Sequence, residues 1–318
     1  TPEPFELVIV DNGSREDVDG WARELEATYD NVLYLRNDAN EGFAYAANQG
    51  LASAGGDVLV LLNNDVVVTP GWLSRQLAVL RADPGVGIVG PCTNATSGVQ
   101  LVGTASYRGL PHLNDFAARW ARDHRAEVAF VPRLVGLCYV MPRRVLQTIG
   151  GFDTLYGYGN YEDDDLCVRA QRAGFRLAVA YDAFLHHHGS ATFKALKLDP
   201  QSHVARNWDL FCAKWGHDPA QRAPRALAAL AASRPFDPFS DHVPVDYDEI
   251  FTPRGPALAL PDRRRSVVLA IPDVDAPGWA EALATRAAPW IGDPDVTLLV
   301  RVEPPTPDRQ AHASAALA

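Results

Sequence analysis

The chain has 318 residues, of which 47% are hydrophobic, so it can form one large domain or two ordinary ones around a substantial core. Its net charge of −10, with no basic block, argues against sequence-independent binding to nucleic acid. No apolar run approaches the roughly 20 residues that cross a bilayer, and no signal-peptide pattern is present, so we expect a soluble protein.

The first part of the chain predicts alternating strands and helices. We expect strands at 5–10, 32–36 and 58–63, with helices near 16–29 and 42–54. Strands separated by helices favour βαβ units, and therefore an α/β, Rossmann-like fold with a mostly parallel sheet and helices on both faces. In such sheets ligands bind beyond the carboxyl ends of the strands.

Polar motifs follow two of these strands. D-N-G-S at 11–14 comes after the first strand, and N-N-D at 63–65 comes after the third. Each motif is also a good turn sequence whatever its function. Their occurrence at neighbouring strand ends favours a binding site. Between them, N-E-G-F-A-Y-A-A-N-Q-G at 40–50 carries small residues that allow close approach of the backbone to a ligand or, alternatively, tight packing of helix on sheet.

Four consecutive acids at 162–165 stand at the predicted start of a helix. Like charges about 4 Å apart repel by roughly 1 to 4 kcal/mol, which indicates a nearby cation, a polar substrate or a raised carboxylate pKa. The alternative is helix-end electrostatics, with Asn160 and Asp163 forming a capping box and Asp165 paired with Arg169. A histidine run at 186–188 follows another predicted strand at 177–185.

The remainder of the chain predicts a second unit. Residues 218–264 are rich in Pro, Ala and Arg, and we expect a short helix and a linker there. Strands at 266–271 and 296–302, with a helix near 278–288 between them, predict one more βαβ unit, too small to bury its own core. We expect 265–318 to be the start of a second, truncated α/β domain; a weaker alternative is that it supplies strands to the first sheet.

The four cysteines form no C-x-x-C pair, which favours free thiols in a reducing compartment: Cys92, Cys138, Cys167 and Cys212. We therefore expect a cytoplasmic protein, with peripheral association at the inner face of the membrane left open.

Six motifs occur in one order along the chain: the motifs at 11–14, 40–50 and 61–65, then G-G-F-D at 150–153, E-D-D-D-L-C-x-R at 162–169 and H-H-H-G-S-A-T-F at 186–193. In this order they resemble family 2 glycosyltransferases of the GT-A fold, most closely the bacterial members that build surface polysaccharides. The resemblance covers about 5–217 and extends to Asn207, Phe211 and K-W-G at 214–216. It implies a glycosyltransferase domain over 1–217 that lacks the first βα unit of the family.

The resemblance also implies roles for individual residues. Asp163 would be the catalytic base and Glu162 would position the acceptor. Asp65 would bind a metal, with His187 completing the site and His186 and His188 as fallbacks. Asp11 would hold a uracil or thymine base and Asn63 the ribose. Further contacts to the sugar nucleotide are expected from four residues: Asn12, Asn40, Gly42, Asn48; Asn64 stands beside Asn63 in the same turn.

One carboxylate, one imidazole and phosphate oxygens suit Mn²⁺ or Mg²⁺, whereas a zinc site would want more nitrogen or sulfur. The function implied is an inverting, metal-dependent glycosyltransferase of hexosyl or rhamnosyl type in polysaccharide or cell-wall biosynthesis. It would move a sugar from a UDP- or dTDP-sugar to a glycan or polyprenol-linked acceptor.

Two other functions stay open. A sugar-1-phosphate nucleotidyltransferase shares the sheet, but would want a Gly-rich phosphate loop with a basic residue after its first strand, which the sequence does not show. A non-catalytic module that binds a glycan or a nucleotide is the other. The acids at 162–165 and the histidine run argue against it.

Overall fold

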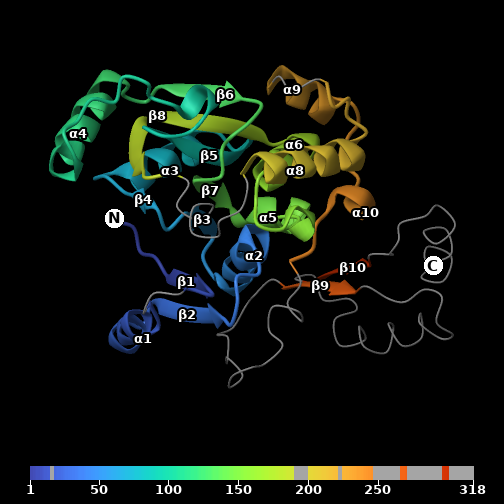
Figure 1. Cartoon of the computed structure of the whole chain (residues 1–318), viewed down its shortest axis with the longest axis horizontal. Helices are drawn as coiled ribbons and strands as arrows, with labels where there is room; N and C mark the ends of the chain where they lie inside the picture. Colours follow the sequence, from blue (N-terminus) through green and yellow to red (C-terminus); the bar gives the residue numbers. More distant parts are fainter. Residues whose placement is uncertain (15–17, 190–199, 221–223, 246–265, 271–295, 301–318) are drawn as a thin grey trace, which may run out of the picture.

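The computed structural model describes residues 1–14, 18–189, 200–220, 224–245, 266–270 and 296–300. The first elements agree with the predicted alternation to within a few residues: β1 (Leu7–Asn12), α1 (Val18–Thr28), β2 (Val32–Asn37), α2 (Phe43–Ser53) and β3 (Val58–Leu62). β1 and β2 pair in parallel in a two-stranded sheet of their own. The chain folds as an α/β protein, as the sequence predicts (Figure 1).

A six-stranded sheet forms the centre of the molecule. Its order is β3-β7-β5-β8-β4, with β6 also paired to β8. The strands not yet bounded are β4 (Val66–Val67), β5 (Val86–Thr93), β6 (Val128–Val131), β7 (Cys138–Pro142) and β8 (Arg176–His187).

The prediction of a mostly parallel sheet is wrong for this sheet, which is mixed. Only the β5·β8 pair is parallel, because β7 runs between β3 and β5 and against both of them. β6, which precedes β7 along the chain, also runs against the parallel pair, because it is antiparallel to β8. Helix-and-strand alternation in the sequence does not reveal such an inserted strand.

Side chains of β7 alternate between the two faces of the sheet. Tyr139 and Met141 join the core beneath α2, α4 (Leu113–Asp123), α5 (Arg143–Ile149) and α6 (Glu162–Arg172). Cys138 and Val140 pack on the opposite face, beneath α3 (Trp72–Ala82). The helices on both faces were therefore correctly predicted.

Three later helices extend this body: α8 (Pro200–Trp215), α9 (Pro224–Ala232) and α10 (Pro238–Asp241). Leu227 and Leu230 of α9 share a buried cluster with Trp208 and Phe211 of α8. The carboxylate of Asp241, 1% exposed, pairs with Arg172 of α6. Residues 224–245, which the sequence assigns to a helix and linker, are thus packed against α6; the part of the linker from 246 to 264 lies outside the described residues.

Near the C-terminal end, β9 (Ser266–Ala270) and β10 (Val296–Val300) form a parallel pair, at the positions of the two predicted strands. Among the described strands, β9 pairs only with β10. The weaker alternative, in which this segment supplies strands to the first sheet, is therefore wrong. The helix expected near 278–288 lies outside the described residues.

All four cysteines are buried and free, as predicted. Burial raises the pKa of Cys92, Cys138 and Cys167 to about 12. Over the part of the chain that the structure describes, every helix is too short or too polar to span a bilayer.

Candidate active site

The two predicted metal ligands lie side by side. Oδ1 of Asp65 is 3.2 Å from Nε2 of His187, and the two side chains are 16% and 15% exposed. The backbone brings them together, because β4 follows Asp65 directly and pairs with the end of β8, with Val66 opposite His187. The N–H of His188 also donates to the carbonyl of Asp65 at 2.9 Å.

His187 is the histidine that faces Asp65, which agrees with the choice made from the sequence. Nδ1 of His186 instead lies against the hydroxyl of Tyr107. His188 is exposed, and its ring packs edge-on against His186.

The surroundings of His187 fit those of a metal ligand. Its Nδ1 is 2.7 Å from the carbonyl oxygen of Ala95, so Nδ1 carries a proton and fixes the ring with Nε2 toward Asp65. The hydrogen bond between the side chains raises the pKa of His187 and lowers that of Asp65. Among the described residues, no group of three or more His, Cys, Asp and Glu side chains is placed to hold a metal. A cation at this pair would take its other ligands from phosphate oxygens or water.

The loop 133–137 connects this pair to α6. The carbonyl of Leu137 accepts from the N–H of Asn63 at 3.0 Å, two residues before Asp65. The N–H of Gly136 donates to Oδ2 of Asp163 at 3.3 Å, and Arg133 pairs with Asp164. One short loop thereby fixes both the 63–65 turn and the acids of α6.

Sequence reasoning missed this loop. Arg133 is the only charged residue between 128 and 142, and that isolation was an available signal. Gly136 was a second signal, because a Cβ there would lie 3.3 Å from the Cβ of Asp163, closer than most real contacts.

The alternative interpretation of the four acids, as helix-end electrostatics, included a capping box of Asn160 and Asp163. That capping box is not formed, so this part of the alternative is wrong. The residue that caps α6 is Tyr161, with φ of +75°, and it makes no side-chain cap hydrogen bond. Asn160 also has a positive φ of +72°, so it cannot serve as an N-cap, which needs an extended backbone. All four acids are buried, with Glu162 and Asp163 7% exposed, Asp164 4% and Asp165 0%.

Asp165 is fully neutralised by cations. Its carboxylate pairs with Arg169 at 2.7 Å, as the i,i+4 spacing predicts, and with Lys214 at 2.6 Å. Tyr156 and Trp215 also donate to it, at 3.3 and 3.0 Å. Burial acts to raise its pKa, but Lys214 and Arg169 outweigh burial and hold the pKa low. Asp165 therefore stabilises the fold.

Glu162 and Asp164 have raised pKa values. Burial and the charge of Asp163 raise the pKa of Asp164 to about 7, although Arg133 opposes this change. Burial and the same neighbour raise the pKa of Glu162 well above its usual value, and its Oε2 has no hydrogen-bond partner. Asp163, by contrast, accepts from two backbone N–H groups, those of Gly136 and, at 2.9 Å, Asp164. The four adjacent carboxyl groups therefore have four different environments.

On the other side of the site, Asn12, Asn40 and Gly42 form one network. Nδ2 of Asn12 donates to Oδ1 of Asn40 and to the carbonyl of Gly42, both at 3.1 Å. Gly42 has φ of +96°, and a Cβ there would overlap the carbonyl of Gly157. The loop at 40–42 is thus held against the segment that leads into α6.

Asp11 is less open than the predicted contact to a nucleotide base requires. Its side chain is 0% exposed, and its carboxylate accepts from Tyr34 at 3.0 Å, Arg36 at 3.1 Å and the N–H of Ser14 at 2.8 Å. Burial acts to raise its pKa, but these hydrogen bonds hold the pKa below its usual value. In this structure Asp11 orients Tyr34 and the 11–14 turn.

Asn48 lies away from the other predicted nucleotide contacts. It is 5% exposed, and its amide exchanges two hydrogen bonds with the backbone of Phe152, at 2.8 and 2.7 Å. A Cβ at Gly151 would overlap its Oδ1. Asn48 therefore fastens α2 to the G-G-F-D segment, and its predicted contact with the nucleotide is not supported by this geometry.

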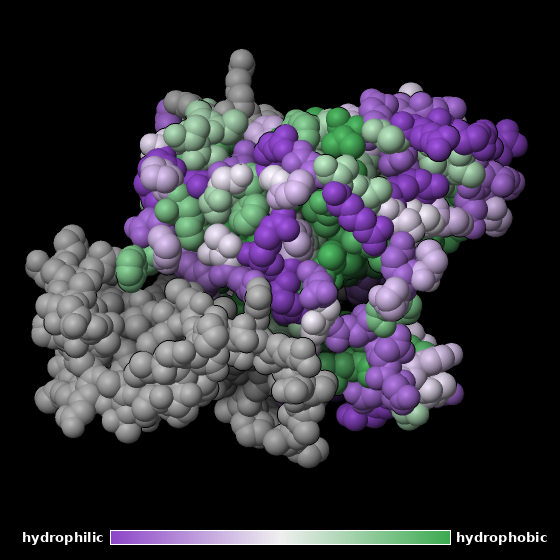
Figure 2. All heavy atoms as spheres, turned by 180° about the vertical axis from the view of Figure 1, so that it is seen from behind, coloured by the Kyte–Doolittle hydropathy of each residue, from purple (hydrophilic) through white to green (hydrophobic). Residues whose placement is uncertain are grey.

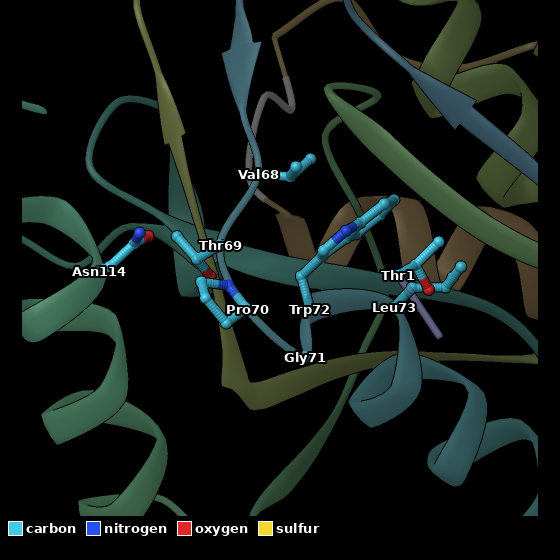
Figure 3. Close-up of a pocket in the computed structure, with 8 residues that line it drawn as sticks. All are labelled: Thr1, Val68, Thr69, Pro70, Gly71, Trp72, Leu73 and Asn114. Atoms are coloured by element: carbon cyan, nitrogen blue, oxygen red, sulfur yellow. The ribbon is translucent and has the colours of Figure 1, made fainter. Parts of the chain in front are cut away.

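Asn63 and Asn64 occupy the turn between β3 and β4, half-buried and exposed respectively, where a ligand can reach them. A pocket of about 280 Å³ follows β4, lined by residues including Trp72, Thr69 and Asn114 (Figure 3). No acid or histidine is among the residues that line this pocket.

The stretch 94–135 covers one side of the site. Leu113, Phe116, Ala117 and Ala121 bury one face of α4, while its other residues are largely exposed. Figure 2 shows hydrophilic residues gathered at the corner of the molecule that α4 occupies. This corner presents a polar surface beside the site.

The chain is similar to several known proteins. The family described as "Glycosyl transferase family 2" matches residues 1–126. The uncharacterized protein y4gI of Sinorhizobium fredii is 30% identical over 199 residues, which is 59% of this chain and 22% of that protein. The O-antigen biosynthesis protein RfbC of Myxococcus xanthus is 27% identical over 208 residues, 60% of this chain and 15% of that protein. Among solved structures, the mannosyltransferase PcManGT from Pyrobaculum calidifontis, in complex with GDP-Man and Mn²⁺, is 19% identical with a TM-score of 0.46, covering 72% of this chain and 59% of that one.

The chain is an α/β protein in which polar residues follow the ends of several strands. Residues 1–126 are thus similar to glycosyltransferase family 2. The chain spans 22% and 15% of the length of the two relatives named above.

Proposed function

We propose that residues 1–217 carry a metal-dependent, inverting glycosyltransferase. It moves a sugar from a UDP- or dTDP-sugar to a hydroxyl of a glycan or polyprenol-linked acceptor. The observation that supports this most is the loop 133–137, which hydrogen-bonds to Asn63 on one side and to Asp163 on the other. A donor held at the 63–65 turn is thereby kept in a fixed relation to a base on α6.

Asp163 is the base in this proposal. It takes the proton of the acceptor hydroxyl as the acceptor oxygen bonds to the anomeric carbon. The bond from that carbon to the phosphate oxygen breaks, and its electron pair leaves with the nucleoside diphosphate. General-base catalysis contributes about 10² to 10⁴ in rate.

The environments of the acids support an inverting outcome. Asp165 is occupied by Arg169 and Lys214, and Asp164 pairs with Arg133. Glu162 has a raised pKa and serves to position the acceptor. One available base and no second nucleophile favour a single displacement at the anomeric carbon.

Asp65 and His187 would hold Mn²⁺ or Mg²⁺ at the diphosphate end of the donor. Bound there, the cation would supply positive charge to neutralise the leaving diphosphate. Asn63 and Asn64 contact the donor from the same turn, and the network of Asn12, Asn40 and Gly42 shapes the nucleotide side. Asp11 supports this side by holding Tyr34 and the 11–14 turn.

For the acceptor we favour a surface polysaccharide or its lipid-linked precursor, with a hexosyl or rhamnosyl group as the sugar moved. Support comes from the similarity to a protein named for O-antigen biosynthesis, and from the polar surface that α4 presents beside the site.

Donor hydrolysis tests the proposal without a known acceptor. The purified chain, incubated with Mn²⁺ and a panel of UDP- and dTDP-sugars, should release the nucleoside diphosphate from one of them. Proton NMR should show that the sugar is released first with the anomeric configuration opposite to that of the donor. Release with retained configuration would refute the single displacement.

A further inference from the structure

The segment before the acids of α6 has an unusual backbone. Gly157, Gly159, Asn160 and Tyr161 all have positive φ, at +58°, +118°, +72° and +75°. Glycine accepts this region at no cost, and asparagine tolerates it, but a bulky side chain such as that of tyrosine is strained there. The left-handed turn 157–161 therefore persists only because its surroundings hold it.

The turn is also incompletely satisfied in hydrogen bonding. Nδ2 of Asn160 and Oε2 of the next acid, Glu162, are both buried and have no partner. Unpaired buried polar atoms are costly and occur mainly where strain or function requires them. Local hydrogen bonds alone do not account for the shape of the turn.

One side chain of α8, that of Asn207, hydrogen-bonds to the backbone of the turn. Asn207 is 0% exposed, and its Nδ2 lies 2.7 Å from the carbonyl oxygen of Tyr156, 2.8 Å from that of Gly159 and 3.2 Å from that of Asn160. His203, one helical turn earlier, lies 2.8 Å from the same Gly159 oxygen. Side chains of α8 thus lie within hydrogen-bonding distance of the backbone carbonyl groups of the turn.

Aromatic packing from α8 supports the same turn. The ring of Tyr161 lies against Trp208 and Phe211, with centroid distances of 5.4 and 5.9 Å. This contact offsets part of the strain at Tyr161, because the half-buried ring packs on α8 in this backbone conformation.

The turn stands between the two halves of the candidate site. On one side, Gly42 approaches Gly157 so closely that a Cβ would not fit. On the other, Glu162 and Asp163 follow Tyr161 directly. A change in the turn would therefore move the base relative to the loop at 40–42.

We propose that Asn207 is a positioning residue that holds the left-handed turn 157–161 and thereby sets the orientation of Glu162 and Asp163. This inference rests on the proposed function, because it takes Asp163 as the base. Asn207 itself touches neither the donor nor the acceptor. Its effect is on the alignment of the base, so turnover should depend on it more than nucleotide binding does.

The test compares Asn207→Ala with Gln76→Ala in the donor-hydrolysis assay. Gln76 is a matched control, since it is another fully buried amide, on α3, away from the turn. Misplacement of a catalytic group by about 1 Å can cost on the order of 10²-fold. Asn207→Ala should lower kcat by about 10- to 100-fold, with the Kd for UDP and Mn²⁺ changed by less than about twofold. Gln76→Ala should lower the unfolding midpoint and leave kcat unchanged.

Two further variants keep the test decisive if Asn207→Ala folds poorly. His203→Ala removes one contact to Gly159 from a half-buried position and should lower kcat in the same direction by a smaller factor. In the double variant of Asn207→Ala with Asn160→Gly, glycine accepts the positive φ without help from α8, so kcat should be partly restored.

The possible failures are distinguishable. Unchanged kcat in both Asn207→Ala and His203→Ala, with Asp163→Asn inactive, would overturn the positioning role and leave the proposed function standing. Full activity of Asp163→Asn would overturn the assignment of the base itself.

Discussion

Two charged regions of the site differ in how their carboxylates are compensated. At β4, Asp65 has one ionic partner, His187, and both side chains are partly exposed. At α6, four acids are buried, and Asp165 alone has two cationic partners. The first region suits a site completed by a ligand and its cation, whereas the second is preorganised by the protein. Binding at Asp65 and His187 should therefore depend on metal and solvent conditions. The stability and activity that the acids of α6 support should depend on mutation of those acids.

The largest effect should come from the base. Asp163→Asn keeps the size of the side chain and one of its two backbone hydrogen bonds, because Gly136 and Asp164 donate to different oxygens, and it removes the ability to accept a proton. Donor hydrolysis should fall by about 10² to 10⁴, with Mn²⁺-dependent UDP binding nearly unchanged. Loss of UDP affinity with little loss of kcat would instead put Asp163 on the donor side.

The next prediction compares how much the carboxylates Asp165 and Asp65 contribute to the free energy of unfolding. Asp165→Asn leaves the buried Arg169 without its counter-charge and leaves Lys214 with Asp153 alone, and we expect a loss of about 3–5 kcal/mol in the free energy of unfolding. Asp65→Asn, at the partly exposed pair, should cost about 1 kcal/mol or less. Urea denaturation of both variants measures the difference, and equal losses would contradict the comparison.

Metal-dependent binding should single out one histidine. His187→Ala removes the imidazole that faces Asp65, so the Kd for UDP in Mn²⁺ should rise about tenfold or more, equal to at least about 1.4 kcal/mol. His188→Ala is the matched control, because His188 is exposed and its ring packs edge-on against His186. A larger effect of His188→Ala would shift the ligand assignment by one residue.

The smallest effect concerns pH. The pKa of Asp164 rises from its ordinary value of 3.8 to about 7 in the folded protein. Between these values the folded state binds more protons than the unfolded state, so Asp164 contributes stability at low pH that is lost as the pH rises toward 7. Asp164→Asn should therefore flatten the fall in stability between pH 4 and 7. The pKa of Glu162 is also raised, so part of the fall in stability with pH should remain in this variant. An unchanged slope would mean that Asp164 is ionised throughout.

The sequence was sufficient for the first elements and for the proximity of Asp65 and His187. Alternation of apolar and polar segments predicted β1 to β3 with their helices, and the order of motifs predicted that Asp65 and His187 would be neighbours. Both predictions use information that is local or carried by a motif. Asp65 and His187 face each other because β4, which follows Asp65, pairs with the end of β8.

The rest depended on contacts between distant segments. The capping box failed because Asn160 and Tyr161 adopt a left-handed backbone that α8 holds from some 50 positions away, which no local pattern encodes. Apart from Arg133, the loop 133–137 contains ordinary apolar residues and glycine, and its contacts to Asn63 and Asp163 use backbone N–H and carbonyl groups. Asn48 matched a motif position, yet it bonds to Phe152 and supports the fold.

The most direct test of the central claim, a metal-dependent sugar-nucleotide site at Asp65 and His187, is calorimetric titration of UDP and dTDP into the chain with and without Mn²⁺. The account predicts binding of at least one nucleotide that requires Mn²⁺ and is lost in Asp65→Ala. Binding that is equal with and without the metal, and unaffected by Asp65→Ala, would contradict it.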